Sequence, residues 1–151
     1  MIAFKKILFP VDLSESSEKI VPYVQVVAKK FESQIYLLFS VRAFEYFATI
    51  DVPFLSISKF EKEIFEGAQK RLPEFAKKYF NEFPDIHTAV LTGDAAEQIV
   101  RYISEQQIDL VIMGTHGRKG IDRIVFGSVA ERVVKNSPVP VMVVNPYKPK
   151  I

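Results

Sequence analysis

One stretch of the chain decides its fold: Ile108-Asp109-Leu110-Val111-Ile112-Met113, then Gly114-Thr115-His116-Gly117-Arg118-Lys119-Gly120 and, after six more residues, Gly127-Ser128. The first part is a mostly apolar run that predicts a buried parallel strand, and a helix is predicted to begin at Ser128. Glycines between a strand and a helix N-terminus let backbone N–H groups approach a phosphate, and the first helical turn adds unpaired donors. The stretch therefore predicts a nucleotide phosphate as the ligand.

The spacing of these glycines differs from that of the common phosphate loops. A Walker loop has a lysine directly before the Ser or Thr at its helix start, whereas Phe126-Gly127-Ser128 has none. A dinucleotide fingerprint places three glycines within six residues, but here nine residues separate Gly117 from Gly127. Neither motif is present.

The rest of the chain alternates apolar runs with helical periods. Strands are predicted over residues 5–12, 34–41, 86–91, 108–113 and 139–144. Capping residues and periodicity predict helices from Ser14 or Ser16 to Phe31, from Ser58 onward, from Asp94, and from Ser128 to about Asn136. This alternation predicts a single α/β domain over residues 1–151, a three-layer sandwich in which helices cover both faces of a five-stranded parallel sheet. Residues 42–57 show neither period, and we expect a packed loop or short helix there.

Composition excludes several classes of function. A chain of 151 residues without cysteine has no disulfide, thiolate nucleophile or Cys-based metal site, which suits the cytoplasm. A net charge of +2, from lysines that are scattered, gives no case for binding nucleic acid. No run approaches the ~20 apolar residues that span a bilayer. The only histidines, His87 and His116, have no cluster of carboxylates around them, so we expect no metal site built from protein ligands.

The chain resembles the universal stress protein family along about its whole length. Ile7-Leu8-Phe9-Pro10-Val11-Asp12-Leu13-Ser14 is similar to the first strand and turn of that family. The run from Gly114 to Ser137-Pro138-Val139-Pro140-Val141-Met142-Val143-Val144 is similar to its last third. The spacing of Gly114, Gly117 and Gly127-Ser128 resembles that of its nucleotide-binding branch. The resemblance implies the strand order 3-2-1-4-5. A ligand would then lie where the order reverses, between the ends of strands one and four.

This resemblance implies a site for an adenine nucleotide. The nucleoside would be held by Pro10, Val11, Asp12 and Val41. The ribose and phosphates would be surrounded by Met113, Gly114, His116, Gly117, Arg118, Gly127, Ser128 and Val129. ATP is the expected ligand, with ADP and AMP as alternatives. Mg²⁺ would enter bound to the phosphates, as is normal for this reluctantly dehydrated ion.

Three of these residues have an alternative role. Asp12 ends a strand and is as well suited to capping the following turn as to contacting a ligand. Ser128 forms a capping box with Glu131, a role that can alternate with phosphate binding. His116 is a candidate general base, although a loop histidine between glycines is more often a phosphate contact or exposed.

The leading functional hypothesis is a cytoplasmic stress-response protein that senses an adenine nucleotide and signals to an unidentified protein partner. By resemblance, it is a homodimer through strand 139–144, paired antiparallel with its mate, because such an uncovered apolar edge favours pairing. The alternative is a slow ATP hydrolase, or an enzyme that phosphorylates itself at Ser128 or a nearby hydroxyl. No catalytic residue is assigned, since no positioned lysine, Walker-B-like acid or convincing base accompanies the loop. A receiver-type phosphoacceptor is set aside because Asp12-Leu13 lacks the acidic pair.

Overall fold

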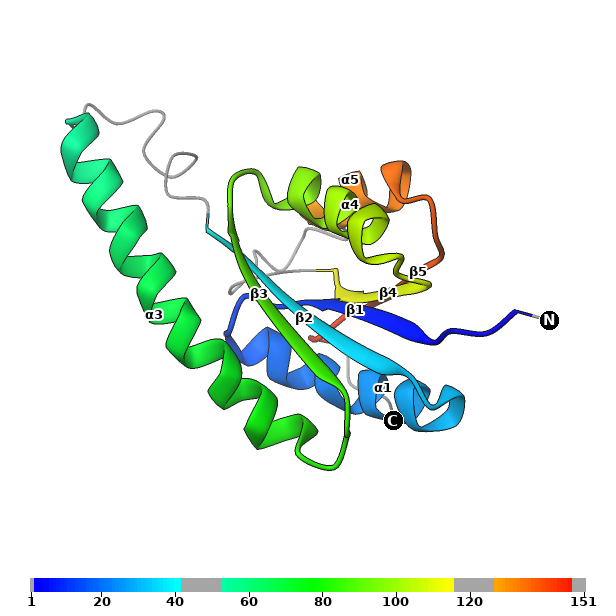
Figure 1. Ribbon diagram of the computed structural model, residues 1–151. Helices are drawn as coiled ribbons and strands as arrows, with labels where there is room; N and C mark the ends of the chain where they lie inside the picture. The colour runs from blue at the N-terminus through cyan, green and yellow to red at the C-terminus, as the bar shows by residue number, and fades with distance from the viewer. Residues whose placement is uncertain (1, 42–52, 116–126, 148–151) are drawn as a thin grey trace.

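The computed structural model describes residues 2–41, 53–115 and 127–147. Its elements are, in chain order, β1 (Lys6–Pro10), α1 (Glu15–Phe31), β2 (Gln34–Val41), α3 (Phe54–Phe80), β3 (Ile86–Thr92), α4 (Ala95–Gln106), β4 (Leu110–Gly114), α5 (Ser128–Asn136) and β5 (Val141–Val144). The strands form one five-stranded sheet in the order β3-β2-β1-β4-β5, and every neighbouring pair is parallel. The predicted α/β class and strand order are confirmed (Figure 1).

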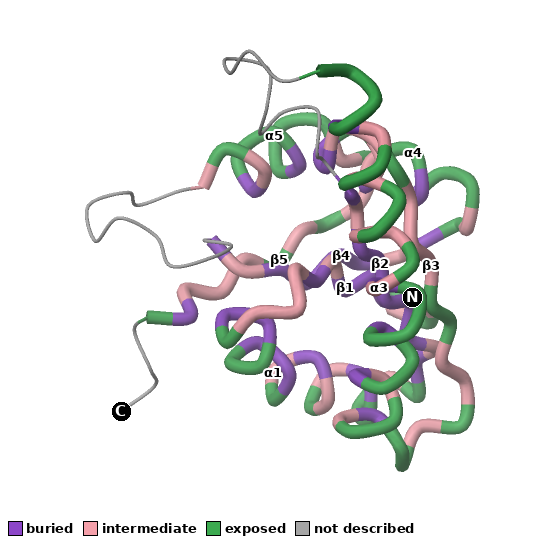
Figure 2. Tube along the Cα trace, turned by 90° about the vertical axis from the view of Figure 1, so that its left-hand side faces the viewer, coloured by how far each residue is buried: buried purple, intermediate pink, exposed green. Residues whose placement is uncertain are grey.

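Two apolar cores lie on the two faces of this sheet. Successive side chains of a strand point to opposite faces, so a strand buried on both sides is apolar throughout. In β1, Ile7 and Phe9 belong to the core that contains α1 and α3, whereas Leu8 belongs to the core that contains α4 and α5. Figure 2 shows α1 on one side of the sheet and α4 and α5 on the other. The five-stranded sheet is therefore the central layer of a three-layer sandwich, with α1 and α3 on one face and α4 and α5 on the other.

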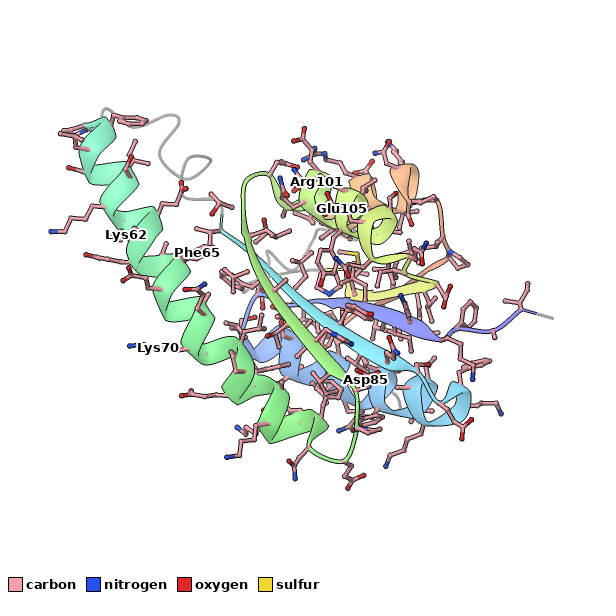
Figure 3. All side chains as sticks on the ribbon, in the orientation of Figure 1. Lys62, Phe65, Lys70, Asp85, Arg101 and Glu105 are labelled. Atoms are coloured by element: carbon pink, nitrogen blue, oxygen red, sulfur yellow. The ribbon has the colours of Figure 1, made fainter. Side chains whose placement is uncertain are left out.

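Helix α3 begins earlier than the sequence predicts. The expected start at Ser58 is wrong, because the helix starts at Phe54 with Pro53 as its N-cap residue. Ile57 is buried and stands seven residues before Ile64, which packs against the core, so the helical apolar period begins before the apparent capping box. In Figure 3, Phe65 points toward the sheet while Lys62 and Lys70 point away from it. The helix thus starts at Phe54 without a side-chain cap.

Relative to prediction, β1 and β5 are shorter and β4 is displaced, whereas β2 matches the predicted 34–41 and β3 ends one residue beyond the predicted 86–91. Asp109, expected within a strand, precedes β4, and its Oδ2 accepts hydrogen bonds from the backbone N–H groups of Lys5 and Lys6, each at 2.9 Å. These contacts join the amino ends of β1 and β4. At the other end, β1 stops at Pro10 and β4 at Gly114, and the two strands pair through Ile7–Leu110 and Leu8–Val111. The carboxyl ends of β1 and β4 therefore lie at the same edge, where the strand order reverses.

Candidate functional site

A cavity of about 370 Å³ lies at this edge. It is bounded by the carboxyl ends of β1, β2 and β4 and by the first turns of α1, α4 and α5. Nine of the predicted site residues line it: Pro10, Val11, Asp12, Val41, Met113, Gly114, Gly127, Ser128 and Val129. The other three predicted residues, His116, Gly117 and Arg118, lie outside the described residues. Segments far apart in the sequence thus meet at the predicted place.

Other residues of the cavity wall were not predicted from the sequence. These are the apolar Phe9, Ile20, Leu38, Phe39, Ile64, Ala95, Ile99 and Ala130, and the hydroxyl-bearing Ser16, Ser17, Ser40 and Thr115. One signal was available for two of them. Ser16 and Ser17 lie in the first turn of a helix that directly follows the predicted strand end, so their side chains start at the ligand edge of the sheet. The residues of α3 and α4 give no such local signal.

Asp12 connects the end of β1 to α1. Its Oδ1 accepts hydrogen bonds from the backbone N–H of Ser14 at 2.9 Å, from the Ser14 hydroxyl at 2.6 Å and from the Ser17 hydroxyl at 2.8 Å. The Ser14 hydroxyl in turn accepts from the backbone N–H of Ser16 at 3.2 Å and caps α1. Among the described residues, Oδ2 of Asp12 is buried and has no hydrogen-bond partner. The turn-cap role weighed for Asp12 therefore falls on Oδ1 alone.

The opposite wall is the start of α5. Its N-cap residue is Gly127, which has extended backbone angles and no side chain with which to cap the helix. The capping box expected at Ser128 is wrong: Ser128 is the first helical residue and is exposed. The first backbone donor bonded within the helix is that of Glu131, which reaches the Gly127 carbonyl at 2.9 Å. The N–H groups of the turn before it have no acceptor within the helix, and they carry the positive end of the helix dipole.

Thr115 joins this wall to the edge of the sheet. Its carbonyl accepts a hydrogen bond from the Gly127 N–H at 2.6 Å, and its own N–H donates to the Val144 carbonyl at 2.8 Å. The residues on either side of the segment 116–126 are thereby held together. The end of β4, the end of β5 and the start of α5 meet at this one buried residue.

Across the cavity, the end of β2 is fixed through its backbone. The Val41 carbonyl accepts from the Gly93 N–H at 2.9 Å, and the Ser40 hydroxyl donates to the Gly93 carbonyl at 3.2 Å. Val41 itself is buried among apolar neighbours. This wall offers a flat ring of a ligand an apolar surface, while polar contacts come from the Asp12 and Gly127 walls.

The charges of the described wall are few. Asp12 is the one ionisable side chain among the described residues that line the cavity. Elsewhere, the part of the chain that the structure describes holds no group of three or more His, Cys, Asp or Glu side chains arranged to bind a metal ion. None of its helices is long and apolar enough to cross a membrane. The described wall therefore offers a ligand an apolar surface, with hydrogen-bonding positions at Asp12 and at the α5 N-terminus.

Comparison with known proteins identifies the family of this fold and site. The model of the universal stress protein family matches residues 3–145. The chain belongs to the universal stress protein family. Universal stress protein MJ0531 of Methanocaldococcus jannaschii is 35% identical over 148 residues, which cover 97% of this chain and 84% of that protein. Universal stress protein MJ0577 of the same organism is 28% identical over 155 residues, covering 95% of this chain and 96% of that one.

Solved structures show the same fold. The structure of MJ0577, solved as a test of structure-based assignment of biochemical function, superposes with a TM-score of 0.83 at 26% identity, covering 99% of this chain and all of that one. A universal stress protein in complex with cAMP has a TM-score of 0.59 at 19% identity, covering 95% of this chain and 98% of that one. Both matches extend over nearly the whole chain.

Proposed function

We propose that this universal stress protein binds an adenine nucleotide, ATP in the first place, and acts as a regulatory protein rather than an efficient enzyme. One observation carries the proposal: a cavity at the reversal of strand order has an uncapped helix N-terminus on one wall and a buried, unpaired carboxylate oxygen on the other. The first favours a phosphate, because it offers free N–H donors and a positive dipole end. The second favours a hydrogen-bond donor, which the nucleoside carries.

The residues of the wall fit such a ligand. The volume of about 370 Å³ lies within the range of about 300–1,000 Å³ that is typical of small-molecule sites. Pro10, Val11, Asp12 and Val41 would hold the nucleoside. Met113, Gly114 and the α5 start at Gly127, Ser128 and Val129 would hold the ribose and phosphates. His116, Gly117 and Arg118 complete the proposed set from sequence alone. The universal stress protein fold holds an adenine nucleotide in the cAMP complex described above, which agrees with this use of the fold.

Mg²⁺ would be bound through the nucleotide phosphates. The described residues offer it no cluster of carboxylates, and Mg²⁺ in nucleotide sites commonly keeps several waters and one or two protein ligands. ADP and AMP remain alternative ligands, since the wall provides contacts to a nucleoside and to phosphate without specifying the number of phosphates.

Regulation fits the site better than turnover does. The described wall holds one ionisable group, Asp12, so it lacks the lysine and the paired acid of the common phosphoryl-transfer sites. Slow ATP hydrolysis, or phosphorylation of the exposed Ser128 by a bound ATP, is the second candidate. We further propose a homodimer through β5, a protein partner that detects the nucleotide state, and a cytoplasmic location, for which the absence of cysteine is suitable.

The most direct test is to identify the ligand that the protein carries. Protein purified without added nucleotide is denatured, and the released small molecule is identified by mass spectrometry. Calorimetry with added ATP should give a dissociation constant of roughly 1 µM, about −8 kcal/mol, because an open site with mainly backbone contacts lacks the enclosure of the tightest nucleotide sites. No released nucleotide and no measurable heat with ATP, ADP or AMP would reject the proposal.

A substitution at the α5 start tests where the phosphates lie. Gly127→Val adds a side chain to the wall from which the phosphate would be bound, so we expect the ATP affinity to fall at least about tenfold, 1.4 kcal/mol. Gly67→Val is the matched control, because Gly67 is in α3, outside the cavity wall, with nothing within 4 Å of an added Cβ. Circular dichroism checks that both variants fold, since valine is a poor N-cap residue. Unchanged affinity in a folded Gly127→Val variant contradicts the assignment.

A further inference from the structure

The turn between β1 and α1 is held by a closed ring of hydrogen bonds. The backbone N–H of Asp12 donates to the Ser17 hydroxyl oxygen at 2.9 Å, and the same hydroxyl donates to Oδ1 of Asp12 at 2.8 Å. Ser17 thus contacts both the backbone and the side chain of Asp12, and it is 95% buried, with a relative exposure of 5%. One serine fixes both the position of the residue and the orientation of its carboxylate.

The turn is held in a conformation that a free chain avoids. Leu13, between Asp12 and Ser14, has φ of 61°, in the left-handed region that is uncommon for a residue with a branched apolar side chain. Such conformations persist where the surroundings determine them. Here the three donors to Oδ1 of Asp12 and the hydrogen-bonded ring through Ser17 hold the turn in this conformation. The left-handed conformation of Leu13 is unfavourable, and the hydrogen bonds that maintain it also fix the position of the Asp12 carboxylate.

The two oxygens of this carboxylate are treated differently. Oδ1 has three donors, whereas Oδ2 is buried and, among the described residues, has none. A buried acceptor without a donor is unfavourable, all the more when it carries charge. Because Asp12 lines the cavity, a donor on a ligand in that cavity can supply the missing hydrogen bond after a small movement of the wall. An acceptor or an anionic group at this point would be repelled.

We propose that Ser17 is a positioning residue for nucleotide binding: it joins the Asp12 backbone to Oδ1 of the same residue and, with Ser14, orients the carboxylate so that Oδ2 can accept a hydrogen bond from a donor on the nucleoside. This inference rests on the proposed nucleotide binding. The donor is a ribose hydroxyl or the adenine 6-amino group. In this role Ser17 acts through the Asp12 carboxylate. The oriented carboxylate requires a hydrogen-bond donor on the nucleoside, so nucleotides that carry this donor bind more tightly than those that lack it.

The neighbouring Ser16 provides a matched control. Ser16 is as buried as Ser17, with a relative exposure of 5% for each, and both line the cavity. The Ser16 hydroxyl, however, lies 3.0 Å from the hydroxyl of Tyr147, whereas the described donors to the Asp12 side chain come from Ser14 and Ser17. Ser16→Ala therefore removes an equally buried hydroxyl from the same wall and leaves all three described donors to Oδ1 of Asp12 in place.

The experiment compares four ligands by calorimetry: ATP, 2′-deoxyATP, 3′-deoxyATP and purine riboside triphosphate, which lacks the 6-amino group. Each is titrated into wild type, Ser17→Ala, Ser17→Thr and Ser16→Ala. In the wild type, the analogue that lacks the relevant donor should bind at least about tenfold more weakly than ATP. In Ser17→Ala the affinity for ATP and the affinity for this analogue should differ by no more than about twofold. In Ser16→Ala, and in Ser17→Thr, which retains the hydroxyl, the ratio of the two affinities should stay as in the wild type. The analogue that shows the loss identifies the donor.

Each other outcome overturns the inference. If all analogues bind the wild type like ATP, Oδ2 accepts no donor. If the ratio is the same in Ser17→Ala as in wild type, Ser17 positions nothing. A ratio that appears only with Mg²⁺, and vanishes in EDTA, assigns Oδ2 to the ion. If the wild type does not bind ATP, the proposed function fails together with the role of Ser17. In the other outcomes ATP still binds, and only the role of Ser17 fails. Should Ser17→Ala not fold, Ser17→Cys replaces it, because a thiol is a weak donor of similar size.

Discussion

The proposed dimer through β5, the strand at the edge of the sheet, can be tested by removing a single backbone N–H group. β5 lies last in the strand order and pairs only with β4 in the described sheet. The Pro140 carbonyl accepts from the Val111 N–H at 3.0 Å, and the Val144 carbonyl accepts from the Thr115 N–H at 2.8 Å. Backbone groups alternate in direction along a strand, so those of residues 140, 142 and 144 face β4. The N–H of Val141 therefore faces the open edge.

Val141→Pro removes this edge donor and leaves the bonds to β4 in place. In a two-fold symmetric dimer each contact occurs twice, so the substitution removes two hydrogen bonds if the partner strand uses this N–H. At about 0.5–1.5 kcal/mol for each, the loss is about 1–3 kcal/mol, which weakens the dimer by about 5- to 150-fold. The steric demand of the proline ring against a partner strand adds to this loss.

Sedimentation equilibrium measures the dimer dissociation constant directly. We expect the wild type to be a dimer at micromolar concentration and Val141→Pro to dissociate, or to aggregate through its altered edge. The matched control is Met142→Pro, whose missing N–H lies on the β4 side; it should lower the free energy of unfolding rather than act on the dimer alone. A Val141→Pro protein with the wild-type dissociation constant, or a wild type that is monomeric at micromolar concentration, refutes the reasoning.

Two further predictions concern stability and turnover. Gly67→Ala should raise the free energy of unfolding by about 0.5–1 kcal/mol, because Gly67 lies in α3 with open space at its Cβ. Gly93→Ala should lower it by about 1–3 kcal/mol, because Gly93 has φ of 135° and an added Cβ would lie 2.9 Å from Nε2 of Gln98; urea unfolding that ranks the two variants in the opposite order would contradict this. ATP hydrolysis should stay below ~0.01 per second, a barrier at least ~4 kcal/mol above that of a typical enzyme at ~10 per second. Turnover faster than about one per second that His116→Ala abolishes while ATP still binds would instead support the enzyme.

The sequence predicts the order of strands and helices well because that order depends on long, repeated apolar patterns. It predicts helix starts less well, since a start is decided by competition between a local cap and distant packing. The Ser58 pattern resembles a cap, yet the helix starts earlier, at Phe54, and Ile57 before Ser58 is buried. Ser128 resembles a cap too, but the extended backbone needed at an N-cap is taken by Gly127. In both cases the local motif is present in the sequence and unused in the fold.

The cavity wall divides in the same way. Its strand ends and the α5 start follow from sequence, because glycine spacing and strand termination are local features. Ile64 of α3 and Ile99 of α4 reach the cavity only because their helices pack on opposite faces of one sheet, which no local pattern specifies. Both residues belong to the apolar stripes of their helices, so the sequence does not show that they line the cavity rather than only pack in the core.

Asp12 shows most clearly what the fold adds. From sequence, an aspartate at the end of a strand and before a helix is equally suited to a cap and to a ligand contact. In the fold, Ser14 and Ser17 bring three donors to Oδ1, and Oδ2 is buried without one. The capping interaction therefore does not compete with ligand binding, because it fixes the carboxylate that a ligand would use. Removing the Ser17 hydroxyl should accordingly weaken the selection among nucleotides while leaving the Ser14 contacts of the turn in place, a separation that a purely structural role for Asp12 would not produce.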